Sequence, residues 1–298
     1  MPNFPVYCGV SVNERIRKRE FFKKIRDIYP KVSFRHFHGP PILFCYNIFM
    51  KITVLNENNT RIDNYLLAEP SLSLYIELEN KKILFDTGYS DVFLKNAETI
   101  GINLNNITDI VISHGHNDHT GGLQYYKPIS KNINLIAHPN IFDKKIEVDG
   151  TAYGCPVSNK ELDNYFSLKL TKSPYYISEN LIFLGEIENN TSKDIDDSAL
   201  TYVKNDMIFI ITGCSHAGII NIINYAKKIT GINNVYGILG GFHLINMPEK
   251  SIENLAKFFK EENIKFLAPC HCCDLKSKII LSKYNRIQDV CVGDTYNL

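Results

Sequence analysis

The sequence predicts an α/β fold in which two β-sheets pack together and helices cover their outer faces. Two hairpin patterns, in which apolar strands are joined by a tight polar turn, predict that neighbouring strands pair. Segments with a helical spacing of apolar residues lie between the later strands. Hairpins interspersed with helices are typical of two sheets that bury one face against each other and the other face under helices.

Strand patterns dominate the chain from Met50 to the middle of the sequence. KITVLN (51–56) is apolar and β-branched, and a hairpin pattern joins LSLYIEL to KKILFDT (81–87). Residues 90–100 are expected to form a helix. The other strands expected in this part are ITDIVIS (107–113) and NINLIAH (132–138).

The second half of the chain adds a further hairpin and two helices. The hairpin ALTYVKNDMIFIITG (199–213) is expected to turn at Asn205-Asp206. Apolar spacing predicts helices at IINIINYAKKI (219–229) and IENLAKFFKEE (252–262). Further strands are expected at NVYGILG (234–240), IKFLA (264–268) and DVCV (289–292).

Residues 1–49 differ in composition from the rest of the chain. They contain five of the twelve prolines, and nine Lys/Arg against three Asp/Glu, with a basic run at residues 15–26. We interpret that run as a solvated amphipathic helix or a disordered tail rather than a contact with anionic lipid or nucleic acid. Because a strand begins cleanly after Met50, residues 1–49 are predicted to be an N-terminal appendage, either disordered or an artefact of start-codon choice.

The overall composition is that of an ordinary globular protein. Hydrophobic residues make up 44% of the chain and charged residues 22%, and the formal net charge of +1 argues against a nucleic-acid partner. We see no signal-peptide pattern and no apolar run of the ~20 residues that a membrane helix needs, so a cytoplasmic protein without membrane contact is expected. In that compartment reduced thiols or metal ligands are expected at the eight cysteines, which are Cys8, Cys45, Cys155, Cys214, Cys270, Cys272, Cys273 and Cys291.

The stretch SHGHNDHTGG (113–122) carries the strongest chemical signal, because it places three histidines and an aspartate within six positions. Bringing four such side chains together is costly unless something binds them all, and one or two metal ions would do so. Residues two apart at a strand end project to the same side, so His114 and His116 can bind one ion. Asp118 and His119 lie beyond them and can face a second ion.

The residues after this cluster suit an anionic substrate. Thr120-Gly121-Gly122 is expected to open a helix, with glycines that let the backbone approach closely and with free N–H groups at the helix start. Imidazole and carboxylate ligands favour zinc, although manganese and iron accept the same ligands. Two divalent metal ions, zinc before manganese or iron, are therefore the expected cofactors.

Five motifs in order resemble those of a known family. HGHNDH (114–119) has the HxHxDH signature of the metallo-β-lactamase superfamily, and ILFDTG (83–88) looks like its upstream aspartate motif. The other three, which are similar to the dihydropterin-synthase-like branch of metal-dependent hydrolases, are TGCSHAGIIN (212–221), GGFHL (240–244) and PCHC (269–272). The resemblance covers residues 50–298. It implies a metallo-β-lactamase-like catalytic domain with a four-layer αββα sandwich of two mixed β-sheets flanked by helices.

The same resemblance implies roles for individual residues. The first metal would be bound by His114, His116 and His216, and the second by Asp118, His119 and His271. Asp86 would stand behind the ligands and hold one of them in place. Asp118 is also expected to be catalytic. His243 follows a buried strand and two glycines, so its loop placement favours a catalytic residue that faces the substrate or acts as an acid or base over a structural role.

Two departures from the family pattern bear on the substrate and the metals. Cys214 stands where many members of the superfamily have a carboxylate that bridges the two ions, although the branch that this chain resembles has Cys there. The resemblance leaves open whether the thiolate binds a metal, and we expect the thiol beside the metals without firm ligation. Pro70-Ser71 replaces the His-Gly expected in this branch, so any substrate contact of that histidine is missing.

Several other polar residues have a structural interpretation. His138, alone at a strand end, is expected to make hydrogen bonds rather than bind metal. Cys270, Cys272 and Cys273 flank His271 without a second C-x-x-C pair, so they are interpreted as thiols that pack near the site. Asp196-Asp197 could supply a carboxylate near the metals or form a charged turn, and the sequence favours neither.

The sequence leaves three functions open. The first is a dinuclear metal-dependent hydrolase of a phosphorylated or otherwise anionic small molecule. The second is a transferase of the dihydropterin-synthase type, in which diphosphate leaves from a pterin-methyl donor. The third is a metal-binding sensor without turnover, against which the complete ligand set argues. The oligomeric state is left open.

Overall fold

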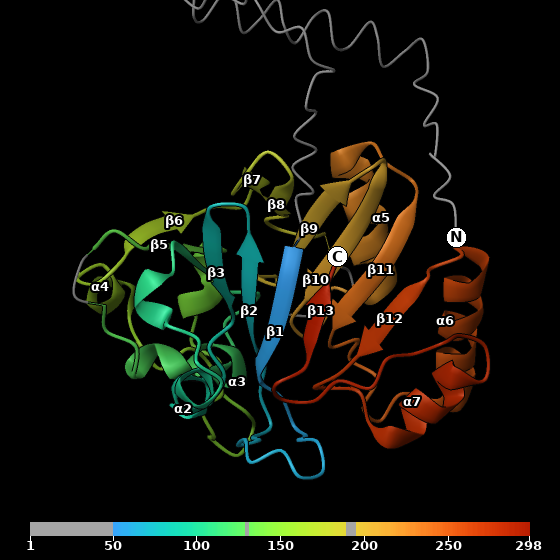
Figure 1. Ribbon diagram of the computed structural model, residues 1–298, viewed down its shortest axis with the longest axis horizontal. Helices are drawn as coiled ribbons and strands as arrows, with labels where there is room; N and C mark the ends of the chain where they lie inside the picture. The colour runs from blue at the N-terminus through green and yellow to red at the C-terminus, as the bar shows by residue number, and fades with distance from the viewer. Residues whose placement is uncertain (1–49, 129–130, 189–194) are drawn as a thin grey trace, which may run out of the picture. The chain divides into compact units, whose positions relative to one another are not determined.

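The structure of the protein, a computed structural model, describes residues 50–128, 131–188 and 195–298. Within these residues two mixed β-sheets lie face to face, and helices cover the outer side of each sheet (Figure 1). This αββα arrangement confirms the fold class predicted from the sequence. The predicted N-terminal appendage, residues 1–49, lies outside the described residues.

The first sheet has seven strands and mixes both pairing directions. Antiparallel pairs join β13, β1, β2 and β3, whereas β3, β4, β5 and β6 pair in parallel. Its strands, in spatial order, are β13 (Thr295–Asn297), β1 (Met50–Asn56), β2 (Ser73–Leu78), β3 (Lys81–Phe85), β4 (Asp109–Val111), β5 (Asn134–Ala137) and β6 (Ser167–Leu170).

The second sheet has six strands and is also mixed. The hairpin of β9 and β10 turns at Asn205-Asp206, as predicted, and β10, β11 and β12 pair in parallel. Its strands, in spatial order, are β12 (Phe266–Pro269), β11 (Val235–Gly240), β10 (Met207–Thr212), β9 (Ala199–Lys204), β8 (Leu181–Phe183) and β7 (Tyr175–Tyr176).

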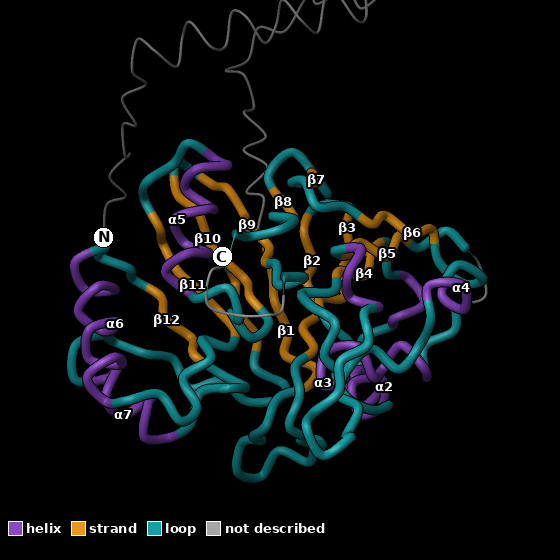
Figure 2. The backbone as a smooth tube through the Cα atoms, turned by 180° about the vertical axis from the view of Figure 1, so that it is seen from behind, coloured by secondary structure: helices purple, strands orange, loops and turns teal. Residues whose placement is uncertain are grey.

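Three apolar cores follow from these layers. The central core lies between the sheets, where residues such as Ile52 and Phe85 pack with Phe209 and Ile211. A second core joins the first sheet to α2 (Val92–Thr99), and a third joins the second sheet to α5 (Ile219–Thr230), α6 (Glu249–Glu261) and α7 (Leu275–Ser282) (Figure 2). Each fully buried large apolar side chain contributes about 1.5–3 kcal/mol, so these cores dominate the stability of the fold.

The two helices predicted for the second half correspond to α5 and α6, whereas α7 was not predicted. α5 begins after Gly218 and ends at Gly231, whose φ of 69° closes the helix in the left-handed conformation. α6 buries Ile252, Leu255 and Phe259 on one face. Among the described residues, no helix is both long enough and apolar enough to cross a membrane.

Two sequence-based expectations about secondary structure were wrong. Residues 289–292 do not form a strand; instead the Asp294 carboxylate accepts a hydrogen bond from the N–H of Cys291 and closes a turn, and the last strand, β13, starts at Thr295. The helix expected to open at Thr120 begins earlier, at Asn117. It forms the single turn α3 (Asn117–Thr120), and a 3₁₀ turn follows at Gly121–Gln124.

The glycines of that 3₁₀ turn have the steric role that the sequence suggested. An added Cβ would collide with the backbone carbonyl of Tyr89 at Gly121 and with that of Thr87 at Gly122. The cluster of histidines is thereby held close to the end of β3. Four strands, β6, β7, β8 and β13, were not predicted from the sequence.

Candidate metal centre

The candidate ligands lie at one end of the two sheets, on loops and on the single helical turn α3. β3 and β4 run in parallel in the first sheet, and β10, β11 and β12 run in parallel in the second. The carboxyl ends of parallel neighbours open on the same edge, which is where ligands bind in α/β folds. The residues that directly follow these strand ends are Asp86, His114, His116, Asp118, His119, Cys214, His216, His243 and His271.

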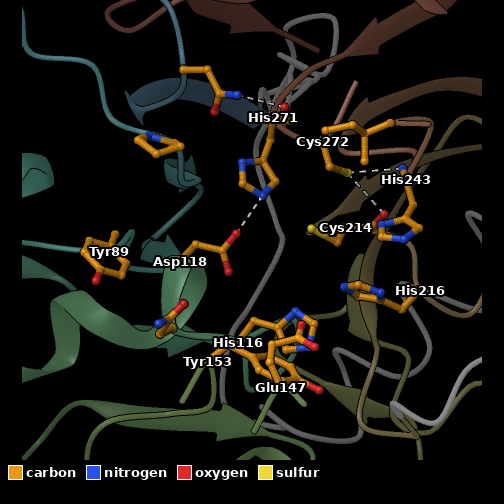
Figure 3. Close-up of a pocket in the computed structure, with 14 residues that line it drawn as sticks. Tyr89, His116, Asp118, Glu147, Tyr153, Cys214, His216, His243, His271 and Cys272 are labelled. Atoms are coloured by element: carbon orange, nitrogen blue, oxygen red, sulfur yellow. Dashed lines mark hydrogen bonds and ion pairs between the residues drawn. The ribbon is translucent and has the colours of Figure 1, made fainter. Parts of the chain in front are cut away.

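One group of converging side chains contains Asp118, His119, His271 and Cys214, which come from both sheets. Figure 3 shows three of them, Asp118, Cys214 and His271, around the cavity. The Nε2 atoms of His119 and His271 are 3.1 Å apart, and His271 Nε2 lies 3.2 Å from Asp118 Oδ2. Cys214 Sγ is 3.3 Å from His119 Nε2. Two imidazoles, a carboxylate and a thiol at these separations form a donor set that suits zinc.

The second group is built from His114, His116 and His216. The ring centroids of His114 and His116 are 4.4 Å apart, and that of His216 lies 4.8 Å from the first and 4.6 Å from the second. His114 with His116 and Asp118, and His114 with His216 and Cys214, each place their ligand atoms within 4.8 Å of one another. The structure therefore brings together all six residues that the resemblance implied as ligands.

His114 provides a test of whether these residues fit a metal ion. Its side chain is fully buried, and Ser113 Oγ lies 3.0 Å from its Nδ1 atom. Among the residues that the structure describes, no hydrogen-bonding group reaches its buried Nε2 atom. Burying a polar atom without a partner costs free energy, and a metal ion at this position would recover that cost. The residues present therefore fit a metal ion.

Burial and neighbouring charges set the protonation states in the absence of metal. Burial, with His119 and His216 nearby, lowers the pKa of His114 well below its usual value, so this imidazole is in the neutral form that binds metals. Burial alone would raise the pKa of Asp118, but the imidazoles of His119 and His271 outweigh it and hold that pKa below its usual range. Asp118 is therefore an anion at neutral pH.

Asp86 lies behind the ligands and orients His119. Its Oδ2 is 2.7 Å from His119 Nδ1 and accepts a 2.8 Å hydrogen bond from Ser113 Oγ, while its Oδ1 accepts one of 2.7 Å from the N–H of Ser113. All three side chains are buried. Asp86 also has a φ of 56°, an unfavourable conformation that such a carboxylate network can hold in place. The proton on His119 Nδ1 leaves Nε2 free to bind an ion.

Asp86→Asn is expected to weaken metal binding at the His119 site by about 10–100-fold. The amide of the new side chain would donate to His119 Nδ1, so the proton would move to Nε2, which then cannot act as a ligand. Titration of the metal-free protein with zinc, in competition with a chelating dye, measures the loss. Asp109→Asn is the matched control, because Asp109 is buried in the same sheet but pairs with Lys81 and Asn134. Equal affinities in both variants would contradict the role of Asp86.

Asp196 and Asp197 hold the two metal loops rather than supply a ligand. Asp196 Oδ2 accepts a 2.8 Å hydrogen bond from the N–H of Gly115, between the first two histidines. Asp197 Oδ2 accepts a bond of the same length from the N–H of Ala217, next to His216. Both aspartates are buried, and neither belongs to a group of converging ligand atoms among the described residues. Of the two interpretations that the sequence left open, the structure agrees in part with the charged turn, because Asp196 lies in a turn, but both carboxylates are buried and bond to the metal loops.

The metal groups lie at the floor of a cavity of about 880 Å³. Tyr89, Asn58 and Pro70 line one side, and Glu147 and Tyr153 line another, where the Tyr153 ring meets His116 edge-on. Among the described lining residues there is no lysine or arginine. An anionic group that enters this cavity would therefore find its positive partners at the metal positions.

His243 lies between this cavity and a second one. Its φ is 50°, its N–H donates a 3.1 Å hydrogen bond to Cys272 Sγ, and its ring centroid is 4.4 Å from that of His216. The second cavity, of about 450 Å³, has apolar walls that include Ile220 and Met247. A histidine in a strained conformation between two cavities is typical of a functional position.

The structure places the other singled-out residues away from the converging atoms. His138 is buried and contacts Glu186 at 3.0 Å through Nε2, while its Nδ1 accepts from the N–H of Asn140. Cys270 packs in the central core, and Cys273 Sγ accepts a hydrogen bond from the N–H of Phe242.

Sequence reasoning missed residues that support or line the site. Glu57 is buried and accepts a 2.8 Å hydrogen bond from the N–H of His271, and Asn58 donates to the carbonyl of the same residue. Glu147 and Tyr153 come from the segment that pairs Ile146 with Ala152. The sequence did contain a signal for Glu57 and Asn58, because these two polar residues directly follow β1 at the end of the sheet where the site was predicted.

Comparison with known sequences finds one matching family profile and two archaeal relatives. The profile of the metallo-beta-lactamase superfamily matches residues 67–194. The 7,8-dihydropterin-6-methyl-4-(beta-D-ribofuranosyl)-aminobenzene-5'-phosphate synthase of Methanocaldococcus jannaschii is 31% identical over 77% of this chain and 89% of its own. An uncharacterised protein of the same archaeon is 32% identical over 73% of this chain and 89% of its own.

Solved structures resemble the fold of this chain. A metal-dependent hydrolase of the beta-lactamase superfamily aligns with a TM-score of 0.71 at 29% identity, covering 84% of this chain and 99% of its own. A diphosphatase of the PhnP family aligns with a TM-score of 0.52 at 14% identity, covering 84% of this chain and 98% of its own. The second likeness supports the fold alone.

Proposed function

Because the chain belongs to the metallo-beta-lactamase superfamily, we propose that it is a dinuclear metal-dependent hydrolase of a phosphorylated or otherwise anionic small molecule. The observation that carries this proposal is the convergence of five imidazoles, a carboxylate and a thiol at the floor of a large cavity. We propose zinc as the metal, since this mixture of nitrogen, oxygen and sulfur ligands suits zinc better than manganese.

Each group of this chain has a definite task in such a reaction. Bound metal ions would polarise a phosphoryl oxygen and acidify a water molecule. Asp118, which is ionised and exposed to the cavity, would orient that water by accepting a hydrogen bond. His243, at the mouth of the second cavity, would give a proton to the leaving group.

The cavity walls support a substrate with one anionic end and a flat body. Tyr89 and Tyr153 offer aromatic surface, and Asn58 and Glu147 offer hydrogen-bonding groups. No basic side chain is among the described lining residues, so the anionic end would bind over the metal positions.

A transferase is the second candidate, and the second cavity favours it. A hydrolase needs only water beside its substrate, whereas a transferase must hold two organic molecules. The 450 Å³ cavity meets the larger one at His216 and His243, so a second molecule would have room next to the metals. The archaeal synthase among the relatives supports a reaction of this class.

Two assays test the proposal. Metal analysis should find about two zinc ions per chain, and the zinc-loaded protein should hydrolyse bis(p-nitrophenyl) phosphate or p-nitrophenyl phosphate, with activity lost to a chelator and restored by zinc. In the second assay a dihydropterin-methyl diphosphate is supplied with and without the ribofuranosyl-aminobenzene phosphate. Diphosphate release that requires the second compound would replace the hydrolase with the transferase. Two bound ions without turnover in either assay would favour a sensor and overturn both.

A further inference from the structure

The larger cavity is lined by a carboxylate that takes no part in the metal groups. Among the described residues that line the cavity, the carboxylates are Asp118 and Glu147. Asp118 converges with the metal-binding side chains, whereas Glu147 belongs to none of their groups. Figure 3 shows Glu147 among the side chains around the cavity, together with the ring of Tyr153. Neither Glu147 nor Tyr153 has a task in the metal centre described above.

Glu147 and Tyr153 lie on the two arms of a short antiparallel hairpin. Ile146 pairs with Ala152, and the N–H of Glu147 donates a 2.9 Å hydrogen bond to the carbonyl of Thr151. Because side chains alternate between the two faces of paired strands, Glu147 and Tyr153 project from the same face. They are diagonal neighbours across the hairpin, a separation that long and aromatic side chains can bridge.

The base of this hairpin is bonded to the segment that carries the metal ligands. The N–H of Asn117 donates a 2.8 Å hydrogen bond to the carbonyl of Tyr153, and Gly154 forms an antiparallel bridge with His116. The ring centroids of Tyr153 and His116 are 5.0 Å apart. The fold therefore sets the separation between the Glu147 carboxylate and an anion bound over the metal positions.

The charge of Glu147 has no partner in the described part of the chain. No lysine or arginine is among the described residues that line the cavity, and no hydrogen bond or ion pair within the described chain occupies this carboxylate. A carboxylate in a cavity wall repels an anion and attracts a cation, more strongly than it would in open water. An aromatic ring beside it, here Tyr153, adds a further attraction for a cation.

We propose that Glu147 and Tyr153 form a subsite for a positively charged nitrogen group of the substrate, such as an ammonium or a protonated amidine. This inference rests on the proposed function and narrows its substrate class to a zwitterion. The phosphoryl end would bind over the metal positions, and the cationic nitrogen would bind at the hairpin. Glu147 would then determine specificity, because it selects the far end of the substrate and not the reacting one.

Binding of simple phosphates tests the subsite without any turnover. The zinc-loaded protein is titrated calorimetrically with ω-aminoalkyl phosphates of increasing chain length, each compared with the alkyl phosphate of the same length. At the best-fitting length the wild type should bind the amine about 5–10-fold more tightly, which an ion pair and a cation–π contact at exposed sites together supply. Glu147→Gln should lower this ratio to about 2, while the alkyl phosphates bind at least as tightly as before. Tyr153→Leu should lower the ratio by about 2–5-fold.

Asp149→Asn is the matched control for the loss of charge. Asp149 lies on the same hairpin and is exposed like Glu147, but it is not among the residues that line the cavity. Its Oδ1 accepts a 2.9 Å hydrogen bond from the N–H of Thr151, which an asparagine oxygen can keep. This variant should retain the wild-type ratio. Far-ultraviolet circular dichroism of each variant checks that the fold is retained.

The outcomes separate this inference from the proposed function. Equal binding of amine and alkyl phosphates at every length, or a preference for the amine that survives Glu147→Gln, would overturn the subsite and leave the proposed function intact. A preference that falls equally in Asp149→Asn would assign it to the general field of the hairpin, which also overturns the subsite. A zinc-loaded protein that binds neither series would overturn the proposed function and the subsite with it.

Discussion

His116→Ala is expected to abolish activity and to remove about one metal ion per chain, because His116 belongs to the group of converging residues that also contains His114 and His216. His116 contributes a ligand atom beside those of His114 and Asp118, and its ring lies 4.6 Å from that of His216. Loss of groups that merely support ligands costs about 10–100-fold, so loss of a ligand should lower kcat/KM by at least roughly 100-fold. Metal analysis of the purified variant and an assay at saturating zinc measure both effects.

His138→Ala is the control for this experiment. His138 is another histidine in the first half of the chain, but it is buried and contacts Glu186 and the N–H of Asn140. It should lose stability while keeping its metal content. Circular dichroism should show unchanged sheets in His116→Ala, since that side chain faces the cavity rather than a core. Full metal occupancy in His116→Ala would remove this residue from the ligand set.

The parts of the molecule that could be predicted are those with a local pattern. The hairpin at 199–213 could be predicted because two apolar strands flank the turn residues Asn205-Asp206. In the structure these two residues have φ values of 50° and 59°. The cluster at 114–119 could also be predicted from a local pattern, because the spacing of its residues alone places several ligands at one strand end. The distant His216 and His271 could be assigned only by resemblance, since nothing local says that their loops meet.

The errors arose where tertiary contacts decide the conformation. The apolar run at 289–292 has the composition of a strand, but the carboxylate of Asp294 closes a turn there and the strand begins three residues later than the run ends. For Asp196 the sequence left open a carboxylate near the metals or a charged turn. Its actual position, buried under the loop of Gly115, depends on Lys145, which lies 51 residues away in the sequence.

Lys145→Met is expected to destabilise the protein by about 3–5 kcal/mol, because it leaves a buried carboxylate without its cation. The Nζ of Lys145 is 2.8 Å from Asp196 Oδ1, and the two side chains are only 8% and 1% exposed. The other oxygen of Asp196 holds the N–H of Gly115, so metal affinity should fall together with stability. Urea unfolding of the metal-free protein measures the first effect, and zinc titration measures the second.

Lys131→Met provides the contrast, because Lys131 pairs with Asp163 at 3.1 Å while both side chains are at least half exposed. An exposed pair is worth about 0–1 kcal/mol, so that variant should unfold almost like the wild type. Combining Lys145→Met with Asp196→Asn should recover much of the loss, since the charge is removed while the amide oxygen still accepts from Gly115. If the double variant were as unstable as Lys145→Met alone, the cost would come from lost packing of the lysine stem and not from an unpaired charge.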